Sequence, residues 1–426
     1  MYMGPDHGGQ IMKNSNFKST SNRSAPTKYR TILHIDANSF FATCETALHP
    51  EYNLVPMAVC GSAEDRHGIV LATNALAKKY GVKTAETLWS AKQKCPNLLL
   101  VRPTYGLYEE ISRKMNRIFY DYTDLVEPFG IDESWLDVTA SKKLFGGGKA
   151  IADAIRGRIK QELGITVSVG VSFNKVFAKL GSDLKKPDAT TLIPPQSFAS
   201  VIWDLPVNYL LFVGPSCART LNRIGIKTIG DLACANPNTL NKYLGKTGVM
   251  LQSFAAGQDY APVTPMGYEP TPKSVSNGMT FRANLATPQD ISFAVTYLSM
   301  SVAERLRKHG LCCNTVAVTI RTPNQQSFNR QAPLNHATCL YSEISKKALD
   351  IIAENQYMHK EIYSLTVHAE KLSPAEDSFQ QQLFADDWEL NYKKHYSLES
   401  AVDSIRARFG RTAIGIASAV KNPLIV

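Results

Sequence analysis

Carboxylates follow apolar, strand-like segments at two places in the chain. Residues 31–36 end on Asp36, and residues 127–139 carry the adjacent pair Asp132 and Glu133 between two short apolar segments. Adjacent carboxylates repel each other unless a cation neutralises them. If the two strands lie side by side, the three acids converge and offer the oxygen ligands that one or two Mg²⁺ ions prefer. Any one of them alone would be typical of a solvated turn.

Lysines are concentrated after the next apolar segment. Residues 172–187 hold Lys175, Lys179, Lys185 and Lys186 and end on a proline. The first two are four residues apart, so a helix places them on one face. A cationic edge facing the carboxylates suits a phosphate group. Lys78 and Lys79 could also reach a phosphate, although a solvated surface pair is the equal alternative.

Two aromatic residues, Phe40 and Phe41, follow Asp36 at the start of an expected helix over residues 39–47. Their position beside the carboxylates permits two interpretations. Both rings could belong to the core, or one could form the floor under a bound sugar.

The composition is that of an ordinary globular protein with a cationic excess. The 426 residues include 47 Lys and Arg against 37 Asp and Glu, a formal charge of +10 that fits a polyanionic partner. The eight cysteines show no metal-ligand spacing, which indicates reduced thiols and a cytoplasmic protein. No apolar segment is long enough to span a membrane. Residues 1–29 are expected to be a disordered tail without a signal peptide.

Elements of both kinds alternate along the chain, which predicts an α+β fold. The first part shows strand patterns at 54–60, 69–73, 98–101 and 167–171 and helix patterns at 74–81, 86–95, 105–122 and 149–163. Residues 199–262 differ, with short helices joined at glycines. Gly214 in Val-Gly-Pro predicts a helix-hairpin-helix that presents backbone N–H groups to a DNA phosphate. A plain helical bundle is the alternative.

The last part follows a proline-rich linker. Strands are expected at 275–284, 314–321 and 361–369, and helices at 288–308, 341–354 and 398–409. Arg282 and Arg321 fall in strands, where one open sheet face could follow a DNA backbone. An exposed charged face without a ligand is the alternative. Gln380, Leu383 and Phe384 form a Gln-x-x-Leu-Phe segment that suits docking of two apolar side chains into a pocket.

In this order the motifs resemble those of Y-family translesion DNA polymerases, of the bacterial DNA polymerase IV (DinB) and UmuC kind. The resemblance runs from about residue 31 to the end. It is carried by Asp-Ala-Asn-Ser-Phe-Phe at 36–41, Gly-Ile-Asp-Glu at 130–133 and the Asn-Lys-x-x-Ala-Lys stretch within 170–187. The helix-hairpin-helix and the basic αβ region complete the set.

The resemblance implies a role for each matching residue. Asp36, Asp132 and the carbonyl of Ala37 would bind two Mg²⁺ ions, and Glu133 would complete the catalytic site. Phe41, beside Phe40 at the nucleotide, would be the steric gate that excludes a ribose 2′-hydroxyl. Lys186 and Lys78 would contact the triphosphate. Gln380, Leu383 and Phe384 would bind a sliding clamp.

The implied fold is a right hand with a ferredoxin-like palm, small fingers, a helical thumb and an αβ little finger. The expected boundaries are a tail at 1–29, palm at 30–48 and 93–198, fingers at 49–92, thumb at 199–260, linker at 261–274 and little finger at 275–426.

The implied function is low-fidelity, DNA-directed DNA synthesis without proofreading, by a cytoplasmic monomer that binds primer–template DNA, dNTPs and a clamp, with no membrane. Ala75 and Lys78 stand where many DNA polymerase IV relatives carry Tyr-x-x-Arg, and Asn38 and Cys44-Glu45 are closer to UmuC. Two alternatives stay open: a catalytically silent, clamp-docking DNA-binding relative, and a nucleotidyl cyclase.

Overall fold

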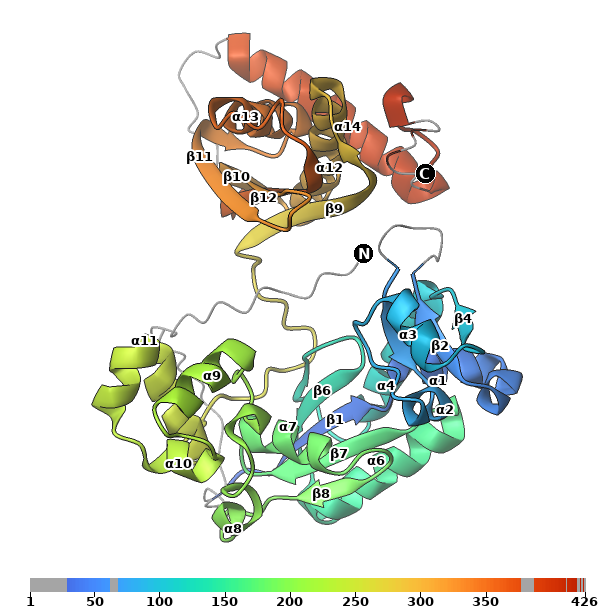
Figure 1. Cartoon of the computed structure of the whole chain (residues 1–426), viewed down its shortest axis with the longest axis vertical. Helices are drawn as coiled ribbons and strands as arrows, with labels where there is room; N and C mark the ends of the chain where they lie inside the picture. Colours follow the sequence, from blue (N-terminus) through green and yellow to red (C-terminus); the bar gives the residue numbers. More distant parts are fainter. Residues whose placement is uncertain are drawn as a thin grey trace. The chain divides into compact units, whose positions relative to one another are not determined.

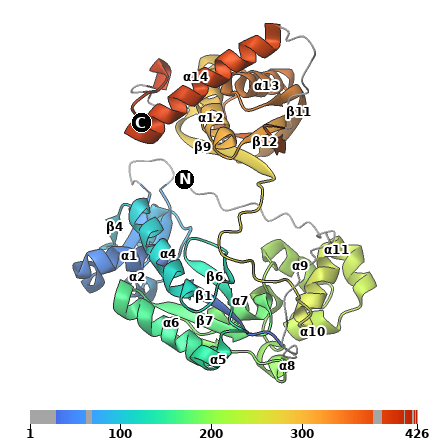
Figure 2. The ribbon, with the colours of Figure 1, turned by 180° about the vertical axis from the view of Figure 1, so that it is seen from behind.

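The computed structural model of the protein describes residues 29–61, 68–376, 387–410, 412–419, 422 and 424. The chain divides into two compact units, residues 1–268 and 269–426, and each is described by itself (Figures 1 and 2). Residues 1–28 and the segment Gln380–Phe384 lie outside the described residues, so the expectations for the tail and the clamp segment stay predictions.

The first unit is built on a five-stranded sheet with the order β5-β6-β1-β7-β8. The strands are β1 (Ile32–Ala37), β5 (Val126–Pro128), β6 (Glu133–Asp137), β7 (Val167–Ser172) and β8 (Thr190–Leu192). The central strand β1 is buried throughout and pairs antiparallel with β6 and β7. The expectation that the two acid-bearing strands lie side by side is therefore confirmed.

Helices cover both faces of this sheet. Helices α4 (Tyr105–Tyr120) and α6 (Gly148–Leu163) lie on one face (Figure 2), where Leu33 and Ile35 of β1 join their apolar side chains in one core. Because side chains alternate along a strand, His34 and Asp36 point to the opposite face. That face carries α7 (Lys175–Leu184) (Figure 1).

Helix α7 approaches the sheet more closely than a side chain would allow, and Gly170 of β7 makes this possible. A Cβ atom at Gly170 would lie 1.9 Å from the carbonyl oxygen of Ala178 and 2.5 Å from the backbone nitrogen of Ser182. Asn174 caps the same helix by accepting a hydrogen bond of 2.8 Å from the Phe177 N–H. Gly170 thus allows the short distance between α7 and the sheet, and Asn174 determines where α7 begins.

A smaller sheet follows the first helix, α1 (Phe40–Leu48), and a short 3₁₀ turn, η1 (Pro50–Leu54). Its order is β3-β2-β4, from β2 (Met57–Cys60), β3 (Val70–Thr73) and β4 (Leu99–Val101), with helices α2 (Ala75–Lys79) and α3 (Leu88–Lys94). Asn74 caps α2 and donates to the carbonyls of Tyr52 and Val55 at 3.0 and 2.8 Å. This amide fixes where α2 begins and therefore the position of Lys78 in that helix.

The rest of the first unit is helical. Helix α5 (Lys142–Phe145) precedes α6, and a separate cluster contains α8 (Phe198–Ile202), η2 (Val207–Tyr209), α9 (Pro215–Arg223), α10 (Ile229–Cys234) and α11 (Pro237–Ala255). These helices share one apolar core. Gly214 stands at the N-terminus of α9, as the sequence predicts.

The second unit is a four-stranded antiparallel sheet with the order β11-β10-β12-β9. It contains β9 (Ser274–Leu285), β10 (Leu311–Arg321), β11 (Ser327–Thr338) and β12 (Ile362–Pro374), with helices α12 (Pro288–Lys308) and α13 (Tyr341–Glu354) packed against the sheet. Helix α14 (Asp387–Phe409) and a turn, η3 (Ala417–Ala419), complete it.

Two elements of the second unit differ from the sequence prediction. Strand β11 was not expected, because most of its side chains are exposed or half-buried and it lacks the apolar alternation of a core strand. Helix α14 begins at Asp387 rather than near residue 398. In the described part of the chain, no helix is long and apolar enough to cross a bilayer.

Candidate active site

The register of β1 and β6 brings the predicted acids together. Asp36 pairs directly with Glu133, and the side chains of both lie on the α7 face. The backbone continues this pairing, since the Ala37 N–H donates to the Asp132 carbonyl at 3.0 Å. Three carboxylates and the Ala37 peptide therefore meet at one end of the sheet, from segments far apart in the sequence.

Lys179 of α7 lies between two of the carboxylates. Its Nζ atom donates to Oδ2 of Asp36 at 2.8 Å and to Oε2 of Glu133 at 2.6 Å. The Lys179 side chain is 15 % exposed, so solvent screens these ion pairs only in part. Lys175, one turn earlier, instead binds Glu127 at 2.5 Å and lies over the Trp135 ring. Of the two lysines predicted to share a face, only Lys179 reaches the acids.

Lys186 contacts the second oxygen of Asp36. Its Nζ atom lies 2.7 Å from Oδ1 of Asp36 and 2.9 Å from Oδ1 of Asp183, one turn of α7 beyond Lys179. Both carboxylate oxygens of Asp36 are therefore bound by lysines. A cation that binds Asp36 would share these oxygens with two ammonium groups that repel it.

The charges at the site perturb its ionisation. Burial and the neighbouring carboxylates Asp36 and Glu133 raise the pKa of Asp132 to about 6. Burial also acts to raise the pKa of Glu133, but His34 and Lys179 outweigh it, and the net shift is downward. The pKa of Lys179 is raised, because the carboxylates around it outweigh its own burial. Asp132 is thus the acid whose charge the chain's own cations compensate least.

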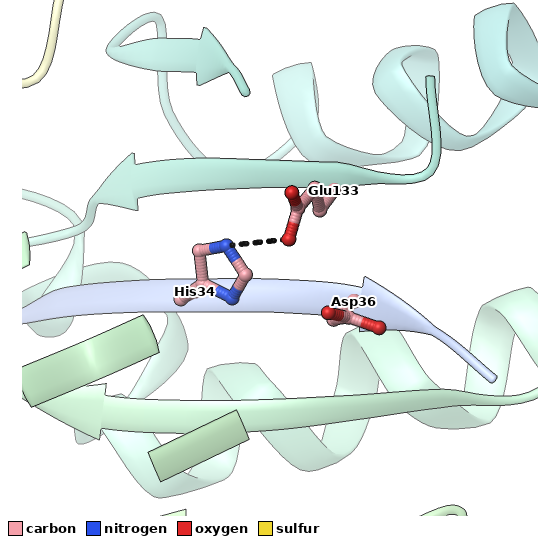
Figure 3. A group of neighbouring side chains, drawn as sticks. All are labelled: His34, Asp36 and Glu133. Atoms are coloured by element: carbon pink, nitrogen blue, oxygen red, sulfur yellow. Dashed lines mark ion pairs between the residues drawn. The ribbon is translucent and has the colours of Figure 1, made fainter. Parts of the chain in front are cut away.

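His34 is a member of the site that residue spacing indicated but the sequence prediction did not include. It stands two residues before Asp36, so strand alternation places it on the same face. The buried ring accepts or donates a hydrogen bond at Nδ1 with Oγ of Ser182 (2.9 Å), and its Nε2 atom lies 3.4 Å from Oε2 of Glu133 (Figure 3). His34 therefore supports Glu133 from inside the sheet.

The donor set fits a divalent cation. Ligand atoms of His34, Asp36 and Glu133 lie within 4.8 Å of one another. The nearby Asp132 has a raised pKa because it is buried and lies beside the carboxylates of Asp36 and Glu133, and a cation would relieve this repulsion. Since Mg²⁺ takes oxygen rather than nitrogen ligands, the three carboxylates and the Ala37 carbonyl are the better candidates, with His34 as their support.

The two aromatic residues after Asp36 take different places. Phe40 is 4 % exposed and belongs to the core formed with α4 and α6. Phe41 is only partly buried, and its ring stacks on that of Tyr108 with centroids 4.3 Å apart. A contact with a bound sugar is therefore available to Phe41 rather than to Phe40.

Lys78 lies near the same end of the sheet. Its Nζ atom donates to Oγ of Ser39 at 2.5 Å, and Ser39 is the N-cap of α1. Desolvation and the charge of Lys186 lower the pKa of Lys78. Lys78 of helix α2 and Lys186, which follows α7, thus repel each other, and an anion bound between them would be stabilised.

The residues predicted to contact DNA lie on other elements than the acids. Gly214 is exposed and adjoins a cavity of about 470 Å³ that Lys179 and Asp183 also line. In the second unit, Arg282 of β9 and Arg321 of β10 are both exposed. Each follows a buried apolar residue, Phe281 and Ile320, so each arginine points away from the covered core face.

Known proteins are similar to this chain both in sequence and in fold. The model of the impB/mucB/samB family matches residues 35–183, and that of the impB/mucB/samB family C-terminal domain matches residues 272–383. The chain is 48 % identical over 381 residues to DNA polymerase IV of Acetivibrio thermocellus, across 89 % of this chain and 95 % of that protein.

More distant relatives carry the same name. DNA polymerase IV 2 of Bacillus subtilis is 35 % identical, across 91 % of this chain and 94 % of its own length. Among solved structures, a Y-family DNA polymerase chimera of Dbh and Dpo4 matches with a TM-score of 0.70 at 24 % identity, across 80 % of this chain and 98 % of that one. That structural match supports the right-hand fold.

Proposed function

The chain belongs to the impB/mucB/samB family and is a DNA-directed DNA polymerase of the Y-family, and from this premise we propose how its residues carry out translesion synthesis. As such a polymerase it acts on DNA and dNTPs and depends on a divalent metal. We propose two Mg²⁺ ions, held by Asp36, Asp132, Glu133 and the Ala37 carbonyl. The register that pairs Asp36 with Glu133 is the observation that carries this proposal.

Bound at these oxygens, the two ions would lower the pKa of the primer 3′-hydroxyl and stabilise the leaving pyrophosphate. The chain's own part is positioning and charge neutralisation, on which phosphoryl transfer mainly depends. Lys186 and Lys78 would bind the triphosphate. The charge of Lys186 contributes to the lowered pKa of Lys78, after desolvation, and an anion between the two ammonium groups would relieve their repulsion. The contact of Lys179 with Glu133 would orient that carboxylate before a metal binds.

Phe41 is proposed as the steric gate. Its ring is the partly exposed member of the aromatic pair beside Asp36, where the sugar of a nucleotide bound at the metals would lie. A 2′-hydroxyl would clash with a ring held in that place, so ribonucleotides would be rejected by sterics rather than by a hydrogen bond.

The proposed domains follow from these roles. The five-stranded sheet is the palm, the small sheet with α2 and α3 the fingers, the helical cluster at 199–260 the thumb, and the second unit the little finger. Gly214 in the thumb and Arg282 and Arg321 in the little finger would contact the DNA backbone. Because the fingers are small, we propose low-fidelity synthesis without proofreading by a cytoplasmic monomer.

Primer extension tests the metal site and the gate together. Wild type with Mg²⁺ and dNTPs should extend a primer, Asp132→Ala should not, and Phe41→Ala should begin to incorporate rNTPs. Failure of wild type to extend, with or without a clamp, would favour a silent DNA-binding protein. Release of pyrophosphate without DNA would favour a nucleotidyl cyclase instead.

The clamp proposal has its own test. Replacing Leu383 and Phe384 by alanine should abolish the stimulation of synthesis by a sliding clamp and leave distributive synthesis unchanged. Gln380→Ala should weaken stimulation in part. An equal loss of both kinds of synthesis would show that the segment serves the fold and not the clamp.

A further inference from the structure

The ring of Phe41 is held by rings from another helix. Phe41 lies in the first turn of α1, and Tyr108 lies near the start of α4. Their ring centroids are 4.3 Å apart and the planes are inclined by only 11°. Tyr105 meets the same ring edge-on, with centroids 6.2 Å apart and an angle of 89°. Both arrangements are favourable geometries for aromatic pairs.

Tyr108 itself has little freedom to move. Its side chain is completely buried, and its hydroxyl donates to Oε1 of Glu45 while accepting the Thr104 N–H at 3.0 Å. Glu45 is 2 % exposed and accepts the same N–H at 3.2 Å. Burial and Glu45 raise the pKa of Tyr108, which keeps the hydroxyl protonated as a donor.

Glu45 and Phe41 are four residues apart on α1, so they lie on the same face of that helix. Tyr108 contacts both, one through its hydroxyl and the other through its ring. Tyr108 of α4 is therefore bound to α1 at two points, Glu45 and Phe41. These two contacts fix the ring plane of Phe41 relative to α1.

We propose that Tyr108, anchored by Glu45, is a specificity-determining positioning residue that holds Phe41 in the orientation that excludes a ribose. The inference rests on the proposed gate function of Phe41. If the Phe41 side chain can change rotamer, a ribose 2′-hydroxyl can be accommodated. The selection against ribonucleotides therefore depends on how much free energy this rotamer change costs. Because Tyr108 is completely buried, it would influence a bound sugar through Phe41.

Removal of the supporting ring should therefore relax sugar selection. In Tyr108→Leu, the ratio of kcat/KM for a dNTP to that for the matching rNTP should fall about 3- to 10-fold, the range expected from loss of one aromatic pair. In Tyr108→Phe the ring remains and the hydroxyl is lost, so the ratio should fall less. Incorporation of dNTPs should stay close to wild type in both.

A double-mutant cycle separates positioning from a general effect on the fold. If Tyr108 acts through Phe41, Tyr108→Leu should not lower the ratio further in a Phe41→Ala background. Tyr120→Leu is the matched control, because Tyr120 lies on the same helix, is half-buried and belongs to the same core. Its ratio should equal that of wild type.

The outcomes distinguish the support role of Tyr108 from the gate role of Phe41 on which it rests. A Phe41→Ala protein that still rejects rNTPs would overturn the gate itself. A relaxed Phe41→Ala with wild-type selection in Tyr108→Leu, or with fully additive losses in the double variant, would overturn the support role alone. If Tyr108→Leu does not fold, Tyr108→Phe and Glu45→Gln test the proposal instead. Wild-type ratios of dNTP to rNTP kcat/KM in both variants would contradict a role for the contact between Tyr108 and Glu45.

Discussion

The Nζ atom of Lys179 lies 2.8 Å from Oδ2 of Asp36, so a cation of the chain itself occupies a place beside the proposed metal ligands. Without this lysine, Asp36 and Glu133 would face each other in directly paired strands with less compensation of their charges, since Lys186 would still bind Asp36. The lysine offsets part of their mutual repulsion and lets the two acids lie close together. The same contact makes the lysine a competitor for the oxygens that a metal must use.

Lys179→Met should therefore destabilise the metal-free protein. The substitution removes the ammonium from two mostly buried ion pairs, with Glu133 and with Asp36, and should cost about 3 kcal/mol. The melting temperature in EDTA should fall, and added Mg²⁺ or Mn²⁺ should raise it more than in wild type. Lys175→Met is the matched control, because that lysine binds Glu127 one turn away. An equal metal response in both variants would contradict the competition.

Asp132→Asn should abolish primer extension and yet stabilise the metal-free protein near neutral pH. The folded-state pKa of Asp132 is raised from 3.8 to about 6 by burial and by the charges of Asp36 and Glu133. The folded protein then binds more protons than the unfolded chain between those values, so the contribution of Asp132 to stability falls as pH rises through this window.

The gain from Asp132→Asn should accordingly be largest above pH 6 and shrink as the pH falls toward 5. A gain of about 1–2 kcal/mol at pH 7.5 is expected, which is below the full value of the shift because water screens the partly exposed group. Urea unfolding in EDTA at the two pH values measures it. A gain that does not depend on pH would mean that the carboxylate is not the cause.

Lys78→Ala should weaken dNTP binding without a matching loss of kcat. The Lys78 ammonium donates to Ser39 and is repelled by Lys186, and a bound triphosphate would offset this repulsion. Loss of one such contact should raise KM for dNTPs about 10-fold, equivalent to roughly 1.4 kcal/mol. Lys79→Ala, the adjacent and exposed lysine of the same helix, should leave KM unchanged. Similar effects in both variants would indicate a general change in charge.

Gly170→Ala should displace α7 and disrupt the site. The new Cβ would lie 1.9 Å from the Ala178 carbonyl oxygen, which no side-chain movement can relieve. We expect a loss of more than about 3 kcal/mol in the free energy of unfolding, or no extension activity in the folded fraction. Gly157→Ala in α6 is the control, because its Cβ would meet nothing within 4 Å. That variant should be stabilised by about 0.5–1 kcal/mol.

The sequence by itself determined the chemistry and much of the local structure. Asp36, Asp132 and Glu133 could be found because acids at the ends of apolar strands are distinctive, and the order of the motifs indicated the family that the comparisons show. Helices such as α12 and strands such as β1 follow from caps and periodicity in adjacent residues. Strand β11 did not, because an exposed edge strand has no such pattern.

Only the tertiary structure decided which of several equivalent residues meet. Periodicity placed Lys175 and Lys179 on one helix face and Phe40 beside Phe41, but the height of α7 over Gly170 brings Lys179 to the acids, and the packing of α1 on α4 leaves Phe41 as the partly exposed ring. The pairing of Asp36 with Glu133 and of Phe41 with Tyr108 joins segments far apart in the chain. Such contacts depend on strand register and helix packing, which local residue patterns do not encode.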